Sequence, residues 1–179
     1  MPPDKKYTRQ QIIDKAFEIA KEEGISSITV RKVADKLDSS TAPIYVNFTD
    51  VDELIEGVIE KTFAISKQIL NNQNSGQPFK DIGLASIKFA REYPVLFQDI
   101  IMSRDDYLEN YDQNLGATLI ETMKQDPELA DFSKEELDKI LLKMRVLQTG
   151  LSVMVANNLF KDELDEEKEV KLLDEIAED

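Results

Sequence analysis

Apolar residues recur at steps of three and four along most of the chain, which is the spacing of one face of an α-helix. The first such segment lies between Thr8 and Gly24. Thr8 and Gln11 have the pattern of a capping box at its start, and Gly24 is a typical helix stop. Its apolar positions are Ile12, Ile13, Ala16, Phe17, Ile19 and Ala20. Because no segment alternates convincingly with the period of two that a half-buried strand requires, the pattern predicts an all-α fold.

Stripes of the same kind predict the remaining helices, about nine in all. Two pairs of residues, Asp50 with Glu53 and Ser133 with Glu136, have the spacing of helix caps. The segment from Asn71 to Pro78 combines Asn, Gly and Pro and is the clearest loop. Two short helices are expected within residues 29–48. The helices predicted after them cover residues 50–69, 79–93, 95–102, 106–125, 133–158 and 165–177.

Residues 29–48 (TVRKVADKLDSSTAPIYVNF) have the pattern of two short helices joined by a turn. Thr29 is a good N-cap for the first helix, whose apolar face includes Val33 and Ala34. Asp38 falls where the chain must turn, and Asp is one of the few residues besides glycine that tolerates a left-handed backbone. The pattern therefore predicts a tight turn at Asp38.

The second short helix is expected to begin after Ser40 as its N-cap. Pro43 is harmless in its first turn, where amide groups have no helical partner. Ile44 and Phe48 turn one face of this helix inward. The residues left on the outer face are Thr41, Ala42, Tyr45, Val46 and Asn47. Since a crossed helix pair with an exposed second helix is the arrangement that enters the major groove of DNA, this stretch predicts a helix-turn-helix.

The side chains of this outer face indicate how bases would be read. Thr41 offers a hydroxyl and a methyl group, and the amide of Asn47 is suited to adenine. Because the second helix has no Arg to bind guanine, the prediction is an operator with A·T contacts at the centre of each half-site. The cations expected to bind phosphate groups are Lys5, Lys6, Arg9, Arg31, Lys32 and Lys36.

Composition limits the chemistry that the chain can perform. It has 179 residues with neither Cys nor His, so it lacks a thiol nucleophile, a His acid–base pair and the usual zinc ligands. We therefore expect no enzyme, no cofactor and no metal site. No apolar run approaches the roughly 20 residues that span a bilayer, and no signal peptide is recognisable, so the expected compartment is the cytoplasm.

The net charge of −14 is unevenly distributed along the chain. Residues 5–47 carry 8 basic and 6 acidic groups, a net charge of +2, whereas residues 66–179 carry 13 basic and 24 acidic groups, a net charge of −11. This polarity favours the N-terminal end as the one that approaches a phosphate backbone, although +2 is a small positive charge for a DNA-binding surface.

The segment from Thr8 to Ile59 resembles the N-terminal domain of the TetR family of bacterial transcriptional regulators. The matching positions are Thr8-Arg9, Ala16-Phe17, Gly24, Thr29-Val30-Arg31, Val33-Ala34, Leu37, Ser40, Ile44-Tyr45, Phe48 and Glu53-Leu54. The resemblance implies a homodimer in which residues 1–49 form a helix-turn-helix DNA-binding domain and residues 50–179 a helical ligand-binding and dimerisation domain. With the cations above, the predicted DNA-binding residues are Thr29, Arg31, Lys32, Ser40, Thr41, Ala42, Pro43, Tyr45, Val46 and Asn47.

The resemblance also implies sites in the C-terminal two thirds. The aromatic and Met residues expected to line a site for a small hydrophobic or aromatic effector are Phe63, Phe89, Tyr93, Phe97, Met102, Tyr107, Tyr111, Met123 and Met154. The residues expected to pair two subunits through the last two long helices are Leu147, Gly150, Leu151, Met154, Asn158, Val170 and Leu173. Burial within a single core is the competing interpretation for both sets.

Some positions depart from the pattern of the family. Many members have Gly in place of Asp38, His in place of Asn47, and Lys where this chain has Thr49 and Val51 at the start of the fourth helix. The acidic sequence TDVDEL there removes a phosphate contact. Two functions therefore remain open. The favoured one is a ligand-responsive repressor on a palindromic operator, and the alternative is a protein-binding co-regulator that has lost DNA binding.

Overall fold

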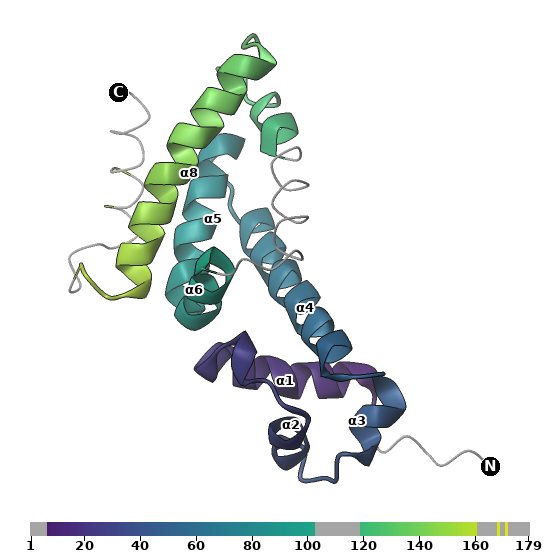
Figure 1. Cartoon of the computed structure of the whole chain (residues 1–179). Helices are drawn as coiled ribbons and strands as arrows, with labels where there is room; N and C mark the ends of the chain where they lie inside the picture. The colour runs from purple at the N-terminus through teal and green to yellow at the C-terminus, as the bar shows by residue number, and fades with distance from the viewer. Residues whose placement is uncertain (1–6, 103–118, 161–167, 169–170, 172–179) are drawn as a thin grey trace. The chain divides into compact units, whose positions relative to one another are not determined.

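The computed structural model describes residues 7–102, 119–160, 168 and 171, apart from the side chains of Phe79, Ile101 and Met102 (Figure 1). The chain divides into two compact units, Met1–Ile65 and Ser66–Asp179. Every regular element in the described part is a helix, so the all-α prediction is confirmed there. No described helix combines the length and the apolar character needed to cross a membrane.

The first unit is built from five helical elements around one apolar core. These are α1 (Arg9–Glu23), the 3₁₀ turn η1 (Ile25–Ser27), α2 (Val30–Lys36), α3 (Ala42–Asn47) and the first part of α4 (Val51–Asn71). The fully buried side chains at its centre are Ile12, Ile19, Val33, Ile44, Leu54 and Val58. Helices α1, α2, α3 and the first part of α4 each bury one face, as the spacing of apolar residues predicts.

The predicted limits of α1 are confirmed. The hydroxyl of Thr8 accepts from the Gln11 amide, and the Gln11 side chain accepts from the Thr8 amide in return. Gly24 ends the helix at φ 92°, a backbone angle that favours glycine. A second glycine, Gly57 in α4, allows a close approach to α1, since a Cβ there would lie 2.8 Å from the Cδ1 of Ile13.

The second unit is formed by α5 (Pro78–Glu92), α6 (Pro94–Met102), helical residues 119–123 and α8 (Lys134–Ala156). Helices α5 and α8 pack side by side, and α6 contacts both (Figure 1). Pro94 separates α5 from α6, as expected from its effect on the preceding residue. One cluster of its core consists of Ile82, Leu119, Ile120, Met123, Leu137 and Leu141.

Two features differ from the sequence-based organisation or lie beyond it. The compact units divide inside α4, after Ile65, and not before this helix as predicted from the boundary at residues 49 and 50. The reason is that the first part of α4 supplies Leu54 and Val58 to the first core. The predicted helix at 165–177 and most of the one at 106–125 lie outside the described residues.

Candidate nucleic-acid interface

A tight turn joins α2 to α3. The Ser39 amide donates to the carbonyl of Ala34 at 3.0 Å, and the Asp38 amide donates to the carbonyl of Asp35 at 3.1 Å. These are the two hydrogen bonds of a Schellman motif, which places its central residue in the left-handed region. Asp38 occupies that position with φ 49°. The predicted turn at Asp38 is therefore confirmed.

Helix α3 presents one buried and one exposed face. Ile44 is 1% exposed, whereas Tyr45 and Val46, the next two residues, are each 60% exposed. Ser40, Thr41 and Ala42 are exposed as well, and Pro43 is half-buried. Two adjacent exposed apolar side chains on one face of a short helix suit a contact surface.

The start of α3 differs from the prediction. Ser40 is not its N-cap, because Thr41 occupies that position and makes no capping bond through its side chain. The backbone of Thr41 is already helical at φ −72° and ψ −14°, which takes its hydroxyl away from capping geometry. The hydroxyls of Ser40 and Thr41 are thus left on the exposed surface.

Asn47 differs more strongly from its predicted role. Its Nδ2 donates to the carbonyl of Pro43 at 2.8 Å and to the carbonyl of Tyr7 at 3.3 Å. An amide engaged in this way does not present its NH₂ group to adenine. In this structure the Asn47 amide instead satisfies carbonyl groups within its own unit.

Three of the four predicted phosphate-binding cations that the structure describes form ion pairs inside the first unit. Lys32 lies 2.6 Å from a carboxylate oxygen of Glu23. Lys36 lies 3.5 Å from Glu22 and 3.7 Å from Glu18. Arg9 lies 2.6 Å from Glu53.

Arg31, at the start of α2, is exposed and forms no ion pair among the residues described. Thr29 caps α2 as predicted by accepting from the Lys32 amide at 3.2 Å, while Lys5 and Lys6 lie outside the described residues.

The start of α4 is fixed by its own acidic residues. Asp50 accepts from the Glu53 amide at 2.9 Å, and Glu53 accepts from the Thr49 amide at 2.7 Å. The Thr49 amide, followed by the Arg9 guanidinium, lowers the pKa of Glu53 below its usual range. Two carboxylates of this acidic segment, Asp50 and Glu53, are thus used to cap α4.

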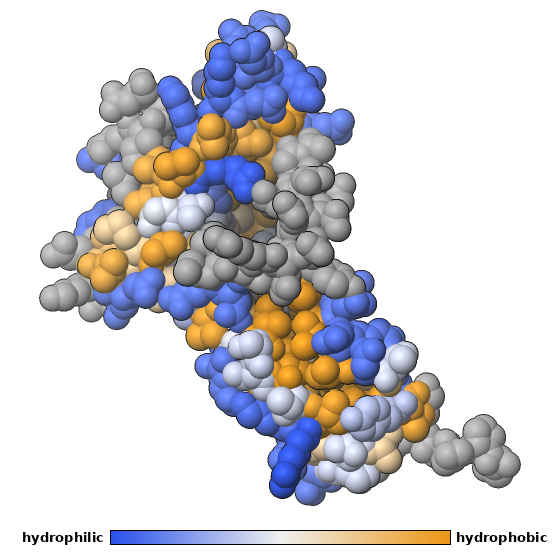
Figure 2. Space-filling model, viewed as in Figure 1, coloured by the Kyte–Doolittle hydropathy of each residue, from blue (hydrophilic) through white to orange (hydrophobic). Residues whose placement is uncertain are grey.

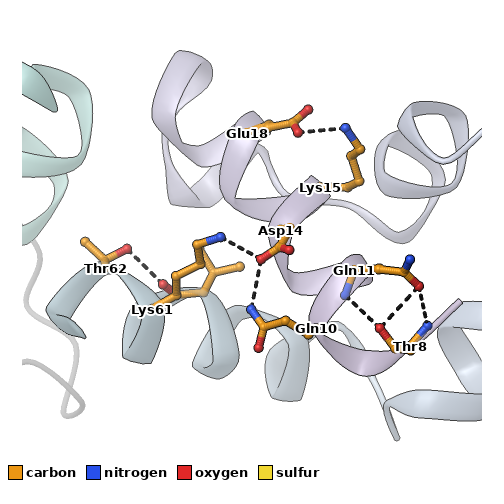
Figure 3. A network of polar contacts seen from close by, with 9 residues as sticks. Thr8, Gln10, Gln11, Asp14, Lys15, Glu18, Lys61 and Thr62 are labelled. Carbon is orange, nitrogen blue, oxygen red and sulfur yellow. Dashed lines mark hydrogen bonds and ion pairs between the residues drawn. The ribbon is translucent and has the colours of Figure 1, made fainter. Parts of the chain in front are cut away.

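A further ion pair connects α1 to α4 (Figure 3). Lys61 Nζ lies 2.6 Å from Asp14 Oδ1, and Gln10 donates to the same oxygen at 2.8 Å. These contacts, with Lys61 first, lower the pKa of Asp14. The Lys61 ammonium also lies 4.8 Å from the ring centroid of Phe17. The pair therefore stabilises the packing of α1 against α4 within the first unit.

The predicted effector-site residues do not form one group in the described structure. Phe89 and Tyr93 of α5 stack with ring centroids 5.4 Å apart, and Phe97 of α6 is buried. Met123 belongs to the buried cluster of the second unit. Three members, the Met102 side chain, Tyr107 and Tyr111, lie outside the described residues.

The other two members, Phe63 and Met154, lie elsewhere. Phe63 belongs to the first unit, not to the second. Met154 is exposed on α8 and does not line an interior site, because its position in the helical repeat turns it away from the core.

The predicted dimer surface is also partly displaced. Leu151 is only 8% exposed and lies in the core of its own unit, whereas it was predicted to pair subunits. Gly150, Met154 and Asn158 are exposed, and Leu147 is half-buried. The most exposed apolar residues of α8 are Leu142 and Val146, at 64% and 68%. Figure 2 shows hydrophobic side chains along this helix. Val170 and Leu173 lie outside the described residues.

Sequence analysis missed four residues that matter here, namely Tyr7, Glu53 as a partner of Arg9, Leu142 and Val146. The partners of Tyr7 and Glu53 are distant along the chain, and no local pattern indicates them. Leu142 and Val146 are spaced by four residues on the helix, a signal that could have identified them as one face.

Comparisons of sequence show that the chain is similar to known regulators. No protein-family model matches the chain. Over 130 residues it is 26% identical to YvkB of Bacillus subtilis strain 168, an uncharacterized HTH-type transcriptional regulator, a match covering 65% of this chain and 66% of that protein. Over 48 residues it is 38% identical to HdnoR of Paenarthrobacter nicotinovorans, an HTH-type nicotine-responsive transcriptional repressor, covering 27% of this chain and 25% of that protein. The chain thus spans just under two thirds of the first relative and a quarter of the second.

Solved structures match over nearly the whole chain. A transcriptional regulator from Rhodococcus sp. Rha1 has a TM-score of 0.69 at 14% identity, covering 96% of this chain and 94% of that one. The fatty acid degradation regulator FadR of Bacillus halodurans has a TM-score of 0.62 at 19% identity, covering 99% and 95%. A TetR-family regulator of Haemophilus influenzae has a TM-score of 0.50 at 20% identity, covering 95% and 92%. The chain therefore shares the fold of TetR-family transcriptional regulators, and its sequence is similar to parts of two HTH-type regulators.

Proposed function

We propose that the chain is a ligand-responsive transcriptional repressor that binds a palindromic DNA operator as a homodimer. The observation that carries this proposal is the exposed face of α3, on which Tyr45 and Val46 are each 60% exposed while Ile44 between the helices is buried. An exposed and uncharged second helix, α3, held on a packed helical core suits insertion into the major groove.

Each part of this face has a distinct role in the proposal. Thr41 and Val46 contact base edges and thymine methyl groups, and Tyr45 donates its hydroxyl to a phosphate. Arg31 supplies the charge, since the other described cations of α2 are paired with carboxylates. Asn47 is left out of the base contacts because its amide is bound within the unit.

Fluorescence anisotropy with DNA from both sides of the gene tests the proposal. The titration is repeated at several salt concentrations, beside the variants Tyr45→Phe and Tyr45→Ala. Nanomolar binding that both variants weaken supports the repressor. Absence of binding both to this DNA and to a random-sequence pool at low salt contradicts it, provided that circular dichroism shows folded protein.

Dimerisation and effector binding are further parts of the proposal. Leu142, Val146 and Met154 give α8 an exposed apolar surface that a second subunit can cover. The stacked pair Phe89–Tyr93 suits an apolar or aromatic effector. Binding of such an effector would shift the population away from the state in which two recognition helices are about one DNA turn, roughly 34–36 Å, apart.

A protein-binding co-regulator is the second candidate, and one observation favours it. Arg9, Lys32 and Lys36 are paired with carboxylates of the same unit, which leaves little unneutralised positive charge on this surface. In that case Tyr45 and Val46 would contact a protein. The random-sequence pool separates the two candidates, because a co-regulator of this kind binds no DNA sequence.

A further inference from the structure

A network of hydrogen bonds connects the start of α1 to the ends of α2 and α3. Tyr7 Oη donates to the Leu37 carbonyl at 2.7 Å, and the Tyr7 carbonyl accepts from Asn47 Nδ2 at 3.3 Å. Arg9 Nη1 donates to the Asn47 carbonyl at 2.9 Å and to Glu53 Oε1 at 2.6 Å. Tyr7, Arg9, Asn47 and Glu53 are called the N-terminal network below.

Helix α3 depends on such contacts because it is short. It has six residues, Ile44 is its one fully buried residue, and its N-cap makes no side-chain bond. Isolated helices of this length do not form in water, so the orientation of α3 must come from tertiary contacts. Ile44 fixes its inner face, and the N-terminal network fixes its C-terminal end.

We propose that Asn47 and Arg9 are positioning residues for DNA recognition, which hold the exposed face of α3 at the angle at which it meets the bases. This inference rests on the proposed function. Both hydrogen bonds of Arg9 come from the same nitrogen, and its guanidinium lies 4.2 Å over the ring of Phe48 at the end of α3. Arg9 therefore connects the end of α3 to the start of α4 through a single nitrogen of its guanidinium.

Conservative variants separate positioning from direct contact. Arg9→Lys keeps the charge but loses the planar group that stacks on Phe48 and bonds Asn47 and Glu53 together. A phosphate contact survives this exchange, whereas a positioning role does not. Arg31→Lys is the matched control, because Arg31 is exposed and its proposed role requires charge alone. Asn74→Ala, at an exposed loop position, is the control for Asn47→Ala.

The binding experiment uses the full-length protein, the selected operator and its single-base variants, at several salt concentrations. Asn47→Ala and Arg9→Lys are expected to weaken binding about 5- to 30-fold, which corresponds to one or two lost interactions. The loss should be equal for every operator variant, and the salt slope should stay unchanged. The inference is overturned if the Asn47→Ala protein loses its preference at a single base pair of the operator. It is also overturned if the Arg9→Lys protein binds the operator with wild-type affinity.

Hydrogen exchange without DNA tests the positioning role independently. The amides of Tyr45 and Phe48 donate within α3 to the carbonyls of Thr41 and Ile44. They should exchange faster in Asn47→Ala and Arg9→Lys, while the buried part of α1 keeps its protection. Unchanged exchange in α3 overturns the inference. If the wild-type protein binds no DNA, the proposed function fails, and exchange alone still decides whether the network positions α3.

Discussion

Replacing Asp38 with glycine is expected to stabilise the first unit. Asp38 holds the left-handed position of the Schellman turn at φ 49°. A left-handed backbone costs most residues roughly 1–2 kcal/mol, and Asp somewhat less because its short side chain tolerates this region. Its negative charge also lies at the C-terminal end of α2, where the helix dipole disfavours anions by about 0.3–1 kcal/mol.

The gain is reduced by the unfolded state, since glycine adds conformational freedom worth about 0.4–1 kcal/mol. The net expectation for Asp38→Gly is a free energy of unfolding larger by about 0.5–1 kcal/mol. Asp38→Asn removes the charge and keeps a side chain that tolerates the turn, so it should recover about half of that gain.

Urea denaturation followed by circular dichroism measures both variants against wild type. The midpoint should rise without a change in slope. The order glycine, then asparagine, then aspartate is required by the two contributions. A destabilised Asp38→Gly protein would refute the reasoning, because it would mean that the aspartate side chain makes a favourable interaction in the turn. An equal increase in the free energy of unfolding in both variants would mean that the whole effect comes from removing the negative charge of Asp38.

Three other changes have clear expected outcomes. Ile44→Ala should lower the free energy of unfolding by about 2–4 kcal/mol, as measured by urea denaturation, because Ile44 is almost fully buried. Asp14→Asn should flatten the acid limb of stability: the pKa of Asp14 is lowered chiefly by Lys61, so this carboxylate stabilises the protein above its ordinary pKa of 3.8, and that contribution is lost as pH falls through the lowered value. An unchanged acid limb in urea titrations between pH 2 and 6 would exclude this role. Leu142→Glu with Val146→Glu should convert a dimer to monomer in sedimentation, and a dimer that survives would place the interface elsewhere.

Local features of the fold could be predicted from sequence because their causes are local. The capping boxes at Thr8 and Ser133 connect residues three apart, and both form as expected. The left-handed turn at Asp38 is likewise decided within a few residues. These features carry their own signal, since a cap needs only an oxygen acceptor at the correct position.

The side-chain partners of the candidate site could not be predicted in the same way. Asn47 meets Tyr7 across 40 positions, and Arg9 meets Glu53 across 44. An exposed-looking amide on a helix has the same pattern whether it faces a base or a neighbouring carbonyl. Similarly, α8 has apolar residues on more than one side, so periodicity alone does not decide whether Leu151 or Leu142 faces the core.

Ion pairing within the first unit changes what DNA binding should look like. Among its described residues Arg9, Lys15, Lys32, Lys36 and Lys61 each have a carboxylate partner. A phosphate contact contributes about 0.9 to the slope of log affinity against log salt, so Arg31 in each of two subunits supplies a slope of about −2. Among the described residues, affinity beyond that comes from neutral contacts such as those of Tyr45 and Thr41. A shallow slope that becomes still shallower in the Arg31→Gln variant would therefore agree with a regulator that reads DNA mainly by shape and base contact. A slope near −8 would mean that Lys5 and Lys6 bind phosphate as well or that the ion pairs open on binding.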